Sequence, residues 1–415
     1  MVKIFSAGLG LCALWLGSAS WSQTVLTVAA YPAVDAIIKA ALPEWNKNHP
    51  NVQVRVVGRE FADHHTAMTT ALAASSGLPD VMTIENGYLG RFSQSGGLEN
   101  LAEAPYLAGR HESRFVPFSW AQGRDERNGQ TAMPTDIGPG AMFYRNDILA
   151  KAGVKPEQLT VSWSSFIEAG KQLRAKTGAH LVAHARDVKD IVIRNGIPTG
   201  EGIYYNAKGE SVVGTSPRFQ QAFTLAKSIR ENDLDAKINA WSNDWGEGLK
   251  RGNITVQMMG AWLGGHLQNW LAPNTSGMWR STTLPEGLAT SWGGTFYAIP
   301  KKAQNKALAW DLIQHLTLSK SQQQSAFEKF NAFPALLEAH SGAFFDQPVA
   351  FLGNQPARTQ WRDTALKIKP TRVFRNDPIA EEIVNAELDQ VLTRGKAVDK
   401  ALADAHRLIQ RRAQR

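Results

Sequence analysis

TVLTVAAYPAVDAIIKAALPEWNKNHPNVQVRVVG, residues 24–58, changes its hydrophobic period twice. Val25, Thr27 and Ala29 alternate along residues 24–30, which predicts a strand ending at Tyr31. Apolar residues at 34, 37, 38, 41 and 45 then recur at helical spacing, and the valines at 52, 54 and 56 predict a second strand. A strand, a helix and a strand in this order indicate a parallel sheet covered by helices.

The same alternation continues along the rest of the chain. Residues 61–77 predict a helix and residues 78–84 a third strand. A second unit begins near Pro134, where TDIGPG interrupts the pattern before a strand and helix over residues 141–153. Further helices and strands follow, among them a helix pair over residues 306–330 and a helical tail from 379 to 410. The pattern predicts two fused α/β units.

The N-terminus has the features of a secretory signal. Lys3 precedes an apolar stretch from Ile4 to Leu16 and a run of small residues, which predicts a cleaved signal peptide over residues 1–22. The single cysteine, Cys12, lies inside it, so we expect an exported protein without a disulfide, a catalytic thiol or a cysteine metal site. The formal charge is +8, but the basic residues are scattered, so we do not expect nucleic-acid binding.

We find no recognisable catalytic motif in the sequence. The chain after the leader contains no phosphate-binding loop, HExxH, GxSxG or SxxK motif. His64 and His65 are adjacent, which points their rings about 100° apart on a helix, so we expect a solvent-facing pair rather than a metal site. We expect no cofactor and no metal. Carboxylates are plentiful, and a glycosidase-type pair stays open, although nothing singles one out.

Five segments together resemble extracellular solute-binding protein family 1, the maltose-binding-protein-like carbohydrate receptors of ABC importers. They are TALAASSGLPDVMTI (70–84), MPTDIGPGAMFYRNDILAKAG (133–153), LKRGNITVQMMGAWLGG (249–265), WGGTFYAIPKKAQNKALAWDLIQHL (292–316) and FPALLEA (333–339). The N-terminal strand that ends at an aromatic residue, Tyr31, also matches, and the resemblance covers essentially the whole chain after the leader, although Val256 stands where the family has a methionine.

The resemblance implies a two-lobed α/β periplasmic-binding-protein fold of type II, with the ligand in a cleft between the lobes. We expect residues 24–134 plus 292–330 to form the N-terminal lobe and residues 135–291 plus 331–415 the C-terminal lobe. It also implies a periplasmic monomer that binds a sugar or oligosaccharide and delivers it to ABC permease subunits without catalysis.

Candidate ligand-binding residues follow the carboxyl ends of the strands, where open α/β sheets bind ligands. Tyr31 either contacts sugar or caps the first strand, Asp80 either contacts ligand or stabilises a turn, and Asp136 lies at the presumed first crossing between lobes. Glu85 and Asn86 end the third strand, and their oxygens can bond vicinal hydroxyls.

Two tryptophans stand at corners beside glycines, where helical or strand packing does not explain them. Trp262 and Trp292 are expected to stack on the apolar face of a sugar ring, with core packing as the alternative. Gly293 would let backbone approach the ligand. Trp245 is a weaker candidate for the same role.

Two other functions stay open. One is a periplasmic lyase or glycosidase, which would need a working carboxylate pair. The other is the same receptor fold with a phosphorylated polyol or sugar acid as ligand, which would need a cation in the cleft, such as Arg59, Arg145 or Arg375.

Overall fold

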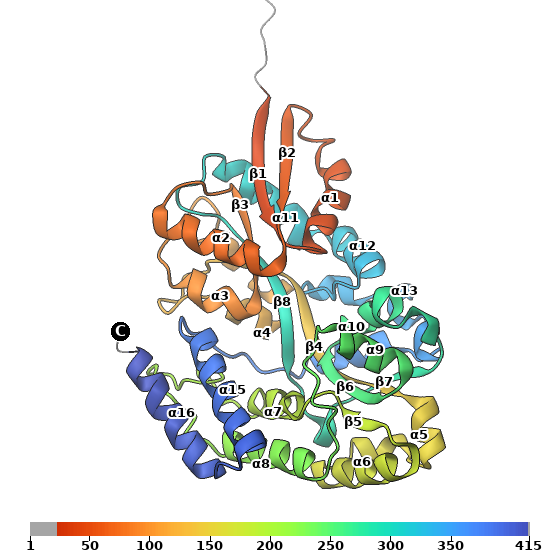
Figure 1. Cartoon of the computed structure of the whole chain (residues 1–415). Coiled ribbons are helices and arrows are strands. Elements are labelled where there is room, and N and C mark those ends of the chain that lie inside the picture. Colours follow the sequence, from red (N-terminus) through yellow and green to blue (C-terminus); the bar gives the residue numbers. More distant parts are fainter. Residues whose placement is uncertain (1–22, 414–415) are drawn as a thin grey trace, which may run out of the picture.

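Eight strands form one twisted sheet that runs through the whole molecule (Figure 1). The computed structural model describes residues 23–413, so the predicted signal peptide lies outside the described residues. The strand order is β2-β1-β3-β8-β4-β6-β5, with β7 paired to β4. The strands are β1 (Thr24–Ala30), β2 (Val52–Gly58), β3 (Val81–Glu85), β4 (Met133–Arg145), β5 (His180–Val182), β6 (Ile254–Gly260), β7 (Trp279–Thr282) and β8 (Ser291–Ala298).

Helices cover this sheet in two groups, which we call the upper and lower halves after their places in Figure 1. The upper half holds β1–β3 with α1 (Val34–Trp45), α2 (Phe61–Ala74), α3 (Asn86–Ser93), α4 (Pro117–Gln122), α11 (Lys306–Leu318) and α12 (Lys320–Phe330). The lower half holds β5–β7 with α5 (Asn146–Ala152), α6 (Trp163–Thr177), α7 (Ala185–Ile193), α8 (Pro217–Glu231), α9 (Asn243–Arg251), α10 (Leu263–His266), α15 (Asp377–Arg394) and α16 (Val398–Ala413). Between them lie α13 (Ala343–Asp346) and α14 (Ala357–Ala365).

The first strand–helix–strand unit forms as its hydrophobic period predicts. β1 and β2 pair in parallel along their whole length, from Thr24 opposite Val52 to Ala30 opposite Gly58. The five apolar residues expected on one face of α1 are all buried. Trp45 at its end donates from Nε1 to Asp311 Oδ2 of α11 at 2.8 Å, which fixes α1 against a helix distant in sequence.

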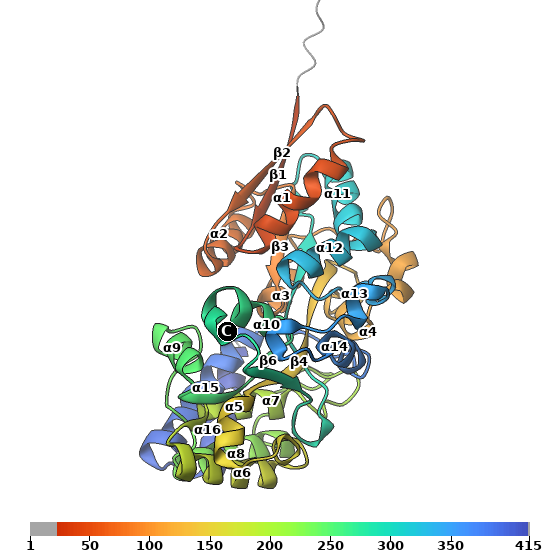
Figure 2. The same cartoon turned by 90° about the vertical axis from the view of Figure 1, so that its right-hand side faces the viewer.

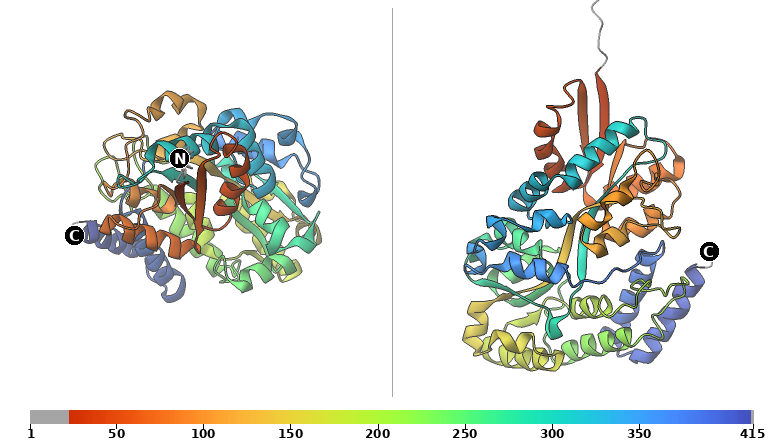
Figure 3. Two further views of the ribbon diagram at one scale, coloured as in Figure 1. Left: turned by 90° about the horizontal axis from the view of Figure 1, so that it is seen from above. Right: turned by 180° about the vertical axis from the view of Figure 1, so that it is seen from behind.

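β4 and β8 connect the two halves. They pair antiparallel from Met133 opposite Tyr297 to Pro139 opposite Ser291, with register shifts near Asp136 and Ile137. Beyond Pro139, β4 pairs with β6 and β7 of the lower half, while β8 pairs with β3 of the upper half. Figure 3 shows both strands passing between the two groups of helices. The register shifts bend the strands where they cross.

Glycine is required at the crossing. A Cβ on Gly138 of β4 would lie only 1.8 Å from the carbonyl oxygen of Trp292 and 2.9 Å from Trp262 Nε1. No side chain fits into that space, so the sequence GPG at 138–140 allows the crossing strands and the Trp262 corner to pack closely.

Asp80 stabilises the opposite end of β3 from the one that ends at Glu85. Its carboxylate accepts hydrogen bonds from the backbone N–H groups of Thr27, Gln304 and Asn305, at 2.8, 3.1 and 2.8 Å. The expectation that Asp80 contacts ligand is therefore corrected, because both carboxylate oxygens join β1 to the segment before α11.

No helix within residues 23–413 combines the length and apolar character needed to cross a bilayer.

Replacing Asp80 by alanine should lower the free energy of unfolding by about 2 kcal/mol, because three partly buried backbone N–H groups lose their acceptor. Urea titration of D80A against the exposed-site control D346A measures this. A D80A protein as stable as D346A would contradict the structural role, and a specific loss of ligand affinity in a fully stable D80A would restore the original expectation.

Candidate ligand-binding site

A polar cavity of about 550 Å³ lies where the two halves meet. Both halves line it, through the β3–α3 junction, the end of α4, residues 194–197 and 203–204 after α7, residues 287–293 into the start of β8, the strap between α14 and α15 (residues 366–376), and the start of α15. The lining includes Glu85, Asn86, Gln122, Arg194, Tyr204, Ser291, Trp292, Gly293, Asp377 and Glu381. A molecule in this cavity would touch both halves at once.

The β3–α3 junction supplies Glu85 and Asn86. Glu85 is the N-cap of α3, and its Oε2 accepts the Gly87 N–H at 2.7 Å. The other oxygen faces Gly293, because a Cβ on that glycine would lie 3.6 Å from Glu85 Oε1. The N-terminus of α3 thus positions the Glu85 carboxylate with Oε2 bonded to the helix and Oε1 directed toward Gly293.

The end of α7 places a cation against Trp292. The guanidinium carbon of Arg194 lies 4.7 Å from the centre of the Trp292 ring, so one face of the indole is already covered by a cation–π contact. Arg194 also contacts Asp190 Oδ1 at 3.4 Å and donates to its backbone carbonyl at 3.0 Å. Trp292 therefore has only its remaining face and its edges for a ligand.

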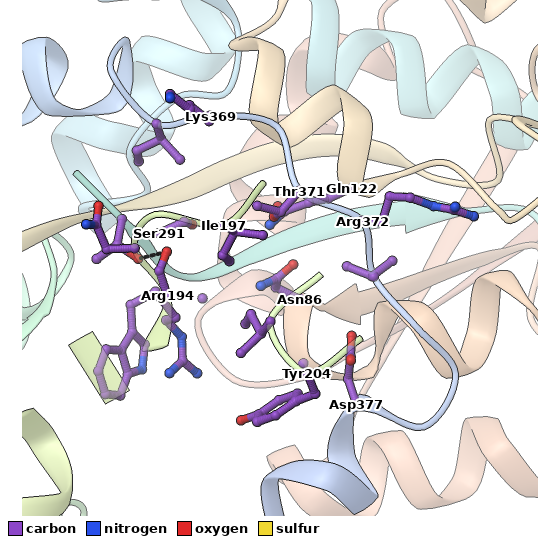
Figure 4. Close-up of a pocket in the computed structure, with 18 of the residues that line it drawn as sticks. Asn86, Gln122, Arg194, Ile197, Tyr204, Ser291, Lys369, Thr371, Arg372 and Asp377 are labelled. Carbon is purple, nitrogen blue, oxygen red and sulfur yellow. Dashed lines mark hydrogen bonds between the residues drawn. The ribbon is translucent and has the colours of Figure 1, made fainter. Parts of the chain in front are cut away.

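Four buried polar atoms of the lining have no hydrogen-bond partner among residues 23–413. They are Asn86 Oδ1, Tyr204 Oη, Ser291 Oγ and Asp377 Oδ1. Figure 4 shows Asn86, Tyr204 and Asp377 in the same part of the cavity, whereas Lys369 and Arg372 extend away from it. Buried polar atoms are costly when unpaired, so this group favours a ligand rich in hydrogen-bonding hydroxyls.

Burial raises the pKa of the acids at this site. The pKa of Glu85 rises to about 7, although the Gly87 N–H opposes the shift. Burial likewise raises the pKa of Asp377 to about 7 and that of Asp136 to about 6. Burial alone would lower the pKa of Arg194, but Asp190 and Glu381 outweigh it and raise that pKa. A carboxyl group whose pKa is near 7 is partly protonated at neutral pH, so it can both donate and accept hydrogen bonds.

The strap that closes the cavity is held by both halves. Gln94, the C-cap of α3, donates from Nε2 to the Val373 carbonyl at 3.2 Å and accepts the Arg375 N–H on its Oε1 at 3.0 Å. From the lower half, the Glu201 carbonyl accepts the Arg372 N–H at 2.9 Å. Gly90 allows this approach, because a Cβ there would lie 2.3 Å from the Phe374 carbonyl oxygen.

The structure brings six of the nine predicted residues, Tyr31, Glu85, Asn86, Asp136, Trp292 and Gly293, to the cavity or its immediate support. Glu85, Asn86, Trp292 and Gly293 line it. Tyr31 is buried beneath and its hydroxyl pairs with Thr295 Oγ1 at 2.7 Å. Asp136 pairs in register with the same Thr295 on β8, so both residues support the floor rather than line the cavity.

Trp262 borders the cavity across Gly293. Its Nε1 donates to the Trp292 carbonyl at 2.8 Å, and a Cβ on Gly293 would lie 3.4 Å from that nitrogen. The indole is partly exposed, so the corner position expected for a sugar platform is present, although it is not among the cavity-lining residues.

Three other expectations are wrong. Trp245 is fully buried and donates to Gln257 Oε1 at 2.8 Å, so it is a core residue and cannot touch ligand. His64 and His65 are also buried rather than solvent-facing. His64 Nε2 lies 2.8 Å from the Thr83 carbonyl oxygen. Arg145 is occupied by Asp147, with Nη2 donating to Oδ2 at 2.8 Å, and is not a cation for the cleft.

Sequence reasoning missed Arg194, Tyr204, Asp377 and Glu381. Asp377 was the easiest of the four to predict, because Asp-Pro at 377–378 signals the start of a helix. A carboxylate at a helix start could have been expected at the rim of the cavity. The other three lie in or after helices without a motif. Among residues 23–413, no three His, Cys, Asp or Glu side chains gather closely enough to hold a metal ion.

The family model of bacterial extracellular solute-binding proteins matches residues 29–323. The chain belongs to this family. The two halves are thus the lobes of the type II periplasmic-binding-protein fold, and the cavity lies between them. Members of the family are binding proteins rather than enzymes by name.

Relatives and solved structures agree with this assignment. The lactose-binding protein of Rhizobium radiobacter is 27% identical over 414 residues, covering 96% of this chain and 94% of that protein. A crystal structure of an extracellular solute-binding protein of family 1 superimposes with a TM-score of 0.82 at 22% identity, over 94% and 99% of the two chains.

A transporter-associated binding protein from B. animalis subsp. lactis Bl-04, solved with β-1,6-galactobiose, has a TM-score of 0.76 at 21% identity. This match covers 93% of the present chain and 96% of that chain. At these identities the solved structures establish the fold.

The raised pKa of Glu85 predicts an unusual pH dependence. The folded protein holds this proton to about pH 7, whereas the unfolded chain releases it near 4.5, so this group makes stability fall as pH rises between these values. E85Q should match the wild type near pH 4.5 and exceed it by about 2 kcal/mol at pH 7.5.

Urea titrations of unliganded protein at both pH values test this, with the exposed-site variant E60Q as a control that should show no pH-dependent gain. An E85Q protein no more stable than wild type at pH 7.5 would contradict the burial of an ionisable group at this position.

Proposed function

We propose that this protein is a periplasmic receptor that binds a neutral sugar or short oligosaccharide between its lobes and delivers it to an ABC permease. The observation that carries the proposal is the set of four buried, unpartnered polar atoms beside an indole in one cavity. Hydroxyl groups of a sugar satisfy such atoms, while the apolar face of its ring packs on an aromatic side chain.

The relatives support this ligand class. Besides the lactose-binding protein, an arabinooligosaccharide-binding protein of Bacillus subtilis is 23% identical over 283 residues, covering 65% of this chain and 63% of that protein. These names, together with the galactobiose bound to the neighbour described above, favour a di- or oligosaccharide over other solutes.

The charges favour a neutral ligand over a sugar acid or phosphate. Three acids, Glu85, Asp377 and Glu381, line the cavity together with four basic residues, Arg194, Lys367, Lys369 and Arg372. Arg194 is already paired with Asp190, and Lys369 and Arg372 extend away from Asn86 and Asp377 in Figure 4. A further negative charge would meet three carboxyl groups, two of them with a pKa raised toward 7 by burial.

Binding between lobes accounts for delivery. A ligand favours a closed state only when it binds that state more tightly than the open one, and this cavity takes residues from both lobes. A receptor that closes on intact sugar offers the permease a signal and releases the same molecule. Export with removal of a signal peptide over residues 1–22 would place the receptor in the periplasm. We expect it to act there as a monomer.

The ligand is identified by a thermal-shift screen of mono-, di- and oligosaccharides, lactose and arabinooligosaccharides included, since a ligand of the native state raises the melting temperature. Incubation with each sugar, followed by assay for new reducing ends or unsaturated products, tests for catalysis. Turnover that disappears in E85Q would replace the receptor by an enzyme.

For the sugar so identified, Y204F should reduce affinity about fivefold, because one buried hydroxyl no longer pairs with the ligand. Calorimetric titration measures the change, with Y106F as the matched control, since Tyr106 is buried in the upper lobe against Trp310. Equal affinities for Y204F and Y106F would contradict the proposed contact.

W292A should reduce the affinity for the same sugar about tenfold, because the free face and edges of the indole line the cavity. The binding stoichiometry should stay at one. W163A, which removes a buried indole from the C-terminal lobe's core, is the control for a general effect on folding. Full sugar affinity in a folded W292A would exclude Trp292 from ligand contact.

A further inference from the structure

Four aromatic side chains outside the cavity form a continuous series, which we call the aromatic row: Trp241, Trp262, His266 and Trp270. Trp262, His266 and Trp270 are spaced by four residues, and one turn of π-helix, Leu267–Leu271, continues α10 beneath the last of them. Spacing by four places them on one helical face, over about 12 Å at 1.5 Å per residue.

The rings of the aromatic row contact one another in sequence. Trp262 and His266 lie 5.4 Å apart between ring centres, and His266 and Trp270 lie 5.7 Å apart, both edge to face. Trp270 Nε1 is 2.9 Å from His266 Nδ1, which fixes the two rings together. Trp241 stacks on Trp262 at 5.8 Å with 23° between the planes.

Two members of the row, Trp241 and Trp270, are exposed to solvent. Trp241 is 55% exposed and Trp270 is 56% exposed, whereas the other tryptophans of residues 23–413 are buried or partly buried. Trp241 has φ of 71°, a left-handed conformation that a bulky side chain rarely adopts. Strained backbone and π-helical turns occur often at functional sites, and here both hold an exposed indole.

The aromatic row begins at the cavity. Trp262 bonds the Trp292 carbonyl and faces Gly293, and both of those residues line the cavity. A ligand chain leaving the cavity past Gly293 would therefore meet Trp262 first and the exposed indoles next. Figure 2 shows α9 and α10 close together beside β6, at the surface of the lower half.

We infer that the aromatic row is an extended subsite for the further rings of an oligosaccharide whose first rings occupy the cavity. The inference rests on the proposed function and adds the ligand's chain length. Rigid, preformed indoles suit the repeated apolar faces of a sugar chain, because little side-chain freedom is lost on binding. Continuity with the cavity favours a saccharide over a protein partner at this surface.

The test is calorimetry with a disaccharide and a tetrasaccharide of one series, using lactose with galactosyl-extended lactose and arabinobiose with arabinotetraose as probes. The wild type should bind the tetrasaccharide of its own series more tightly. W241A and W270A should each reduce the affinity for the tetrasaccharide about tenfold and leave the affinity for the disaccharide unchanged. The control V161A truncates an exposed apolar side chain elsewhere in the lower lobe and should change neither.

Three results would overturn the inference, each for a distinct reason. If folded W241A and W270A bind both lengths like wild type, the row is no subsite, while sugar binding by the cavity stands. If these variants bind sugar normally but fail to stimulate ATP hydrolysis by the reconstituted permease, the row is a protein-contact surface. If the wild type binds no saccharide in either series or in the wider screen, the proposed function falls and this inference with it.

Discussion

The pairing of β4 with β8 is the constraint on which the rest of the molecule depends. These strands hydrogen-bond to each other from Met133 opposite Tyr297 to Pro139 opposite Ser291, and each then continues into a different lobe. Two strands of the chain therefore cross between the lobes, and the backbone hydrogen bonds between them make this connection a paired ladder rather than a free linker. The register shifts and Gly138 let the ladder bend and let Trp262 lie across it.

The site is a consequence of that crossing. β3 ends at Glu85 beside β8, so one carboxylate of the upper lobe faces Gly293, and α7 brings Arg194 against Trp292 from below. The strap between α14 and α15 then closes the cavity, with Gln94 bonding it to the upper lobe and Glu201 to the lower. Polar groups from both lobes are thereby buried together, which raises the pKa of Glu85 and leaves four polar atoms for a ligand.

Periodicity predicted the parts of this structure that local pattern determines. The buried face of α1 and the parallel pairing of β1 and β2 could be expected from the sequence, as could Glu85 and Asn86 at a strand end. Asp80 and Trp245 show where the reasoning stops. Both have the residue type of a binding group, yet one joins β1 to the segment before α11 and the other bonds Gln257 in the core. Only the three-dimensional partners of a side chain separate these roles.

Arg194, Tyr204 and Asp377 could not be placed together from sequence, because Arg194 and Tyr204 follow α7 while Asp377 begins α15, more than 170 residues later. Hydrogen exchange of the sugar complex against free protein tests the account most directly. Binding should slow amide exchange near 85–87, 194–197, 290–293 and 371–377, thus in both lobes and the strap at once. Slowing confined to one lobe, or to residues away from this cavity, would contradict a ligand held between them.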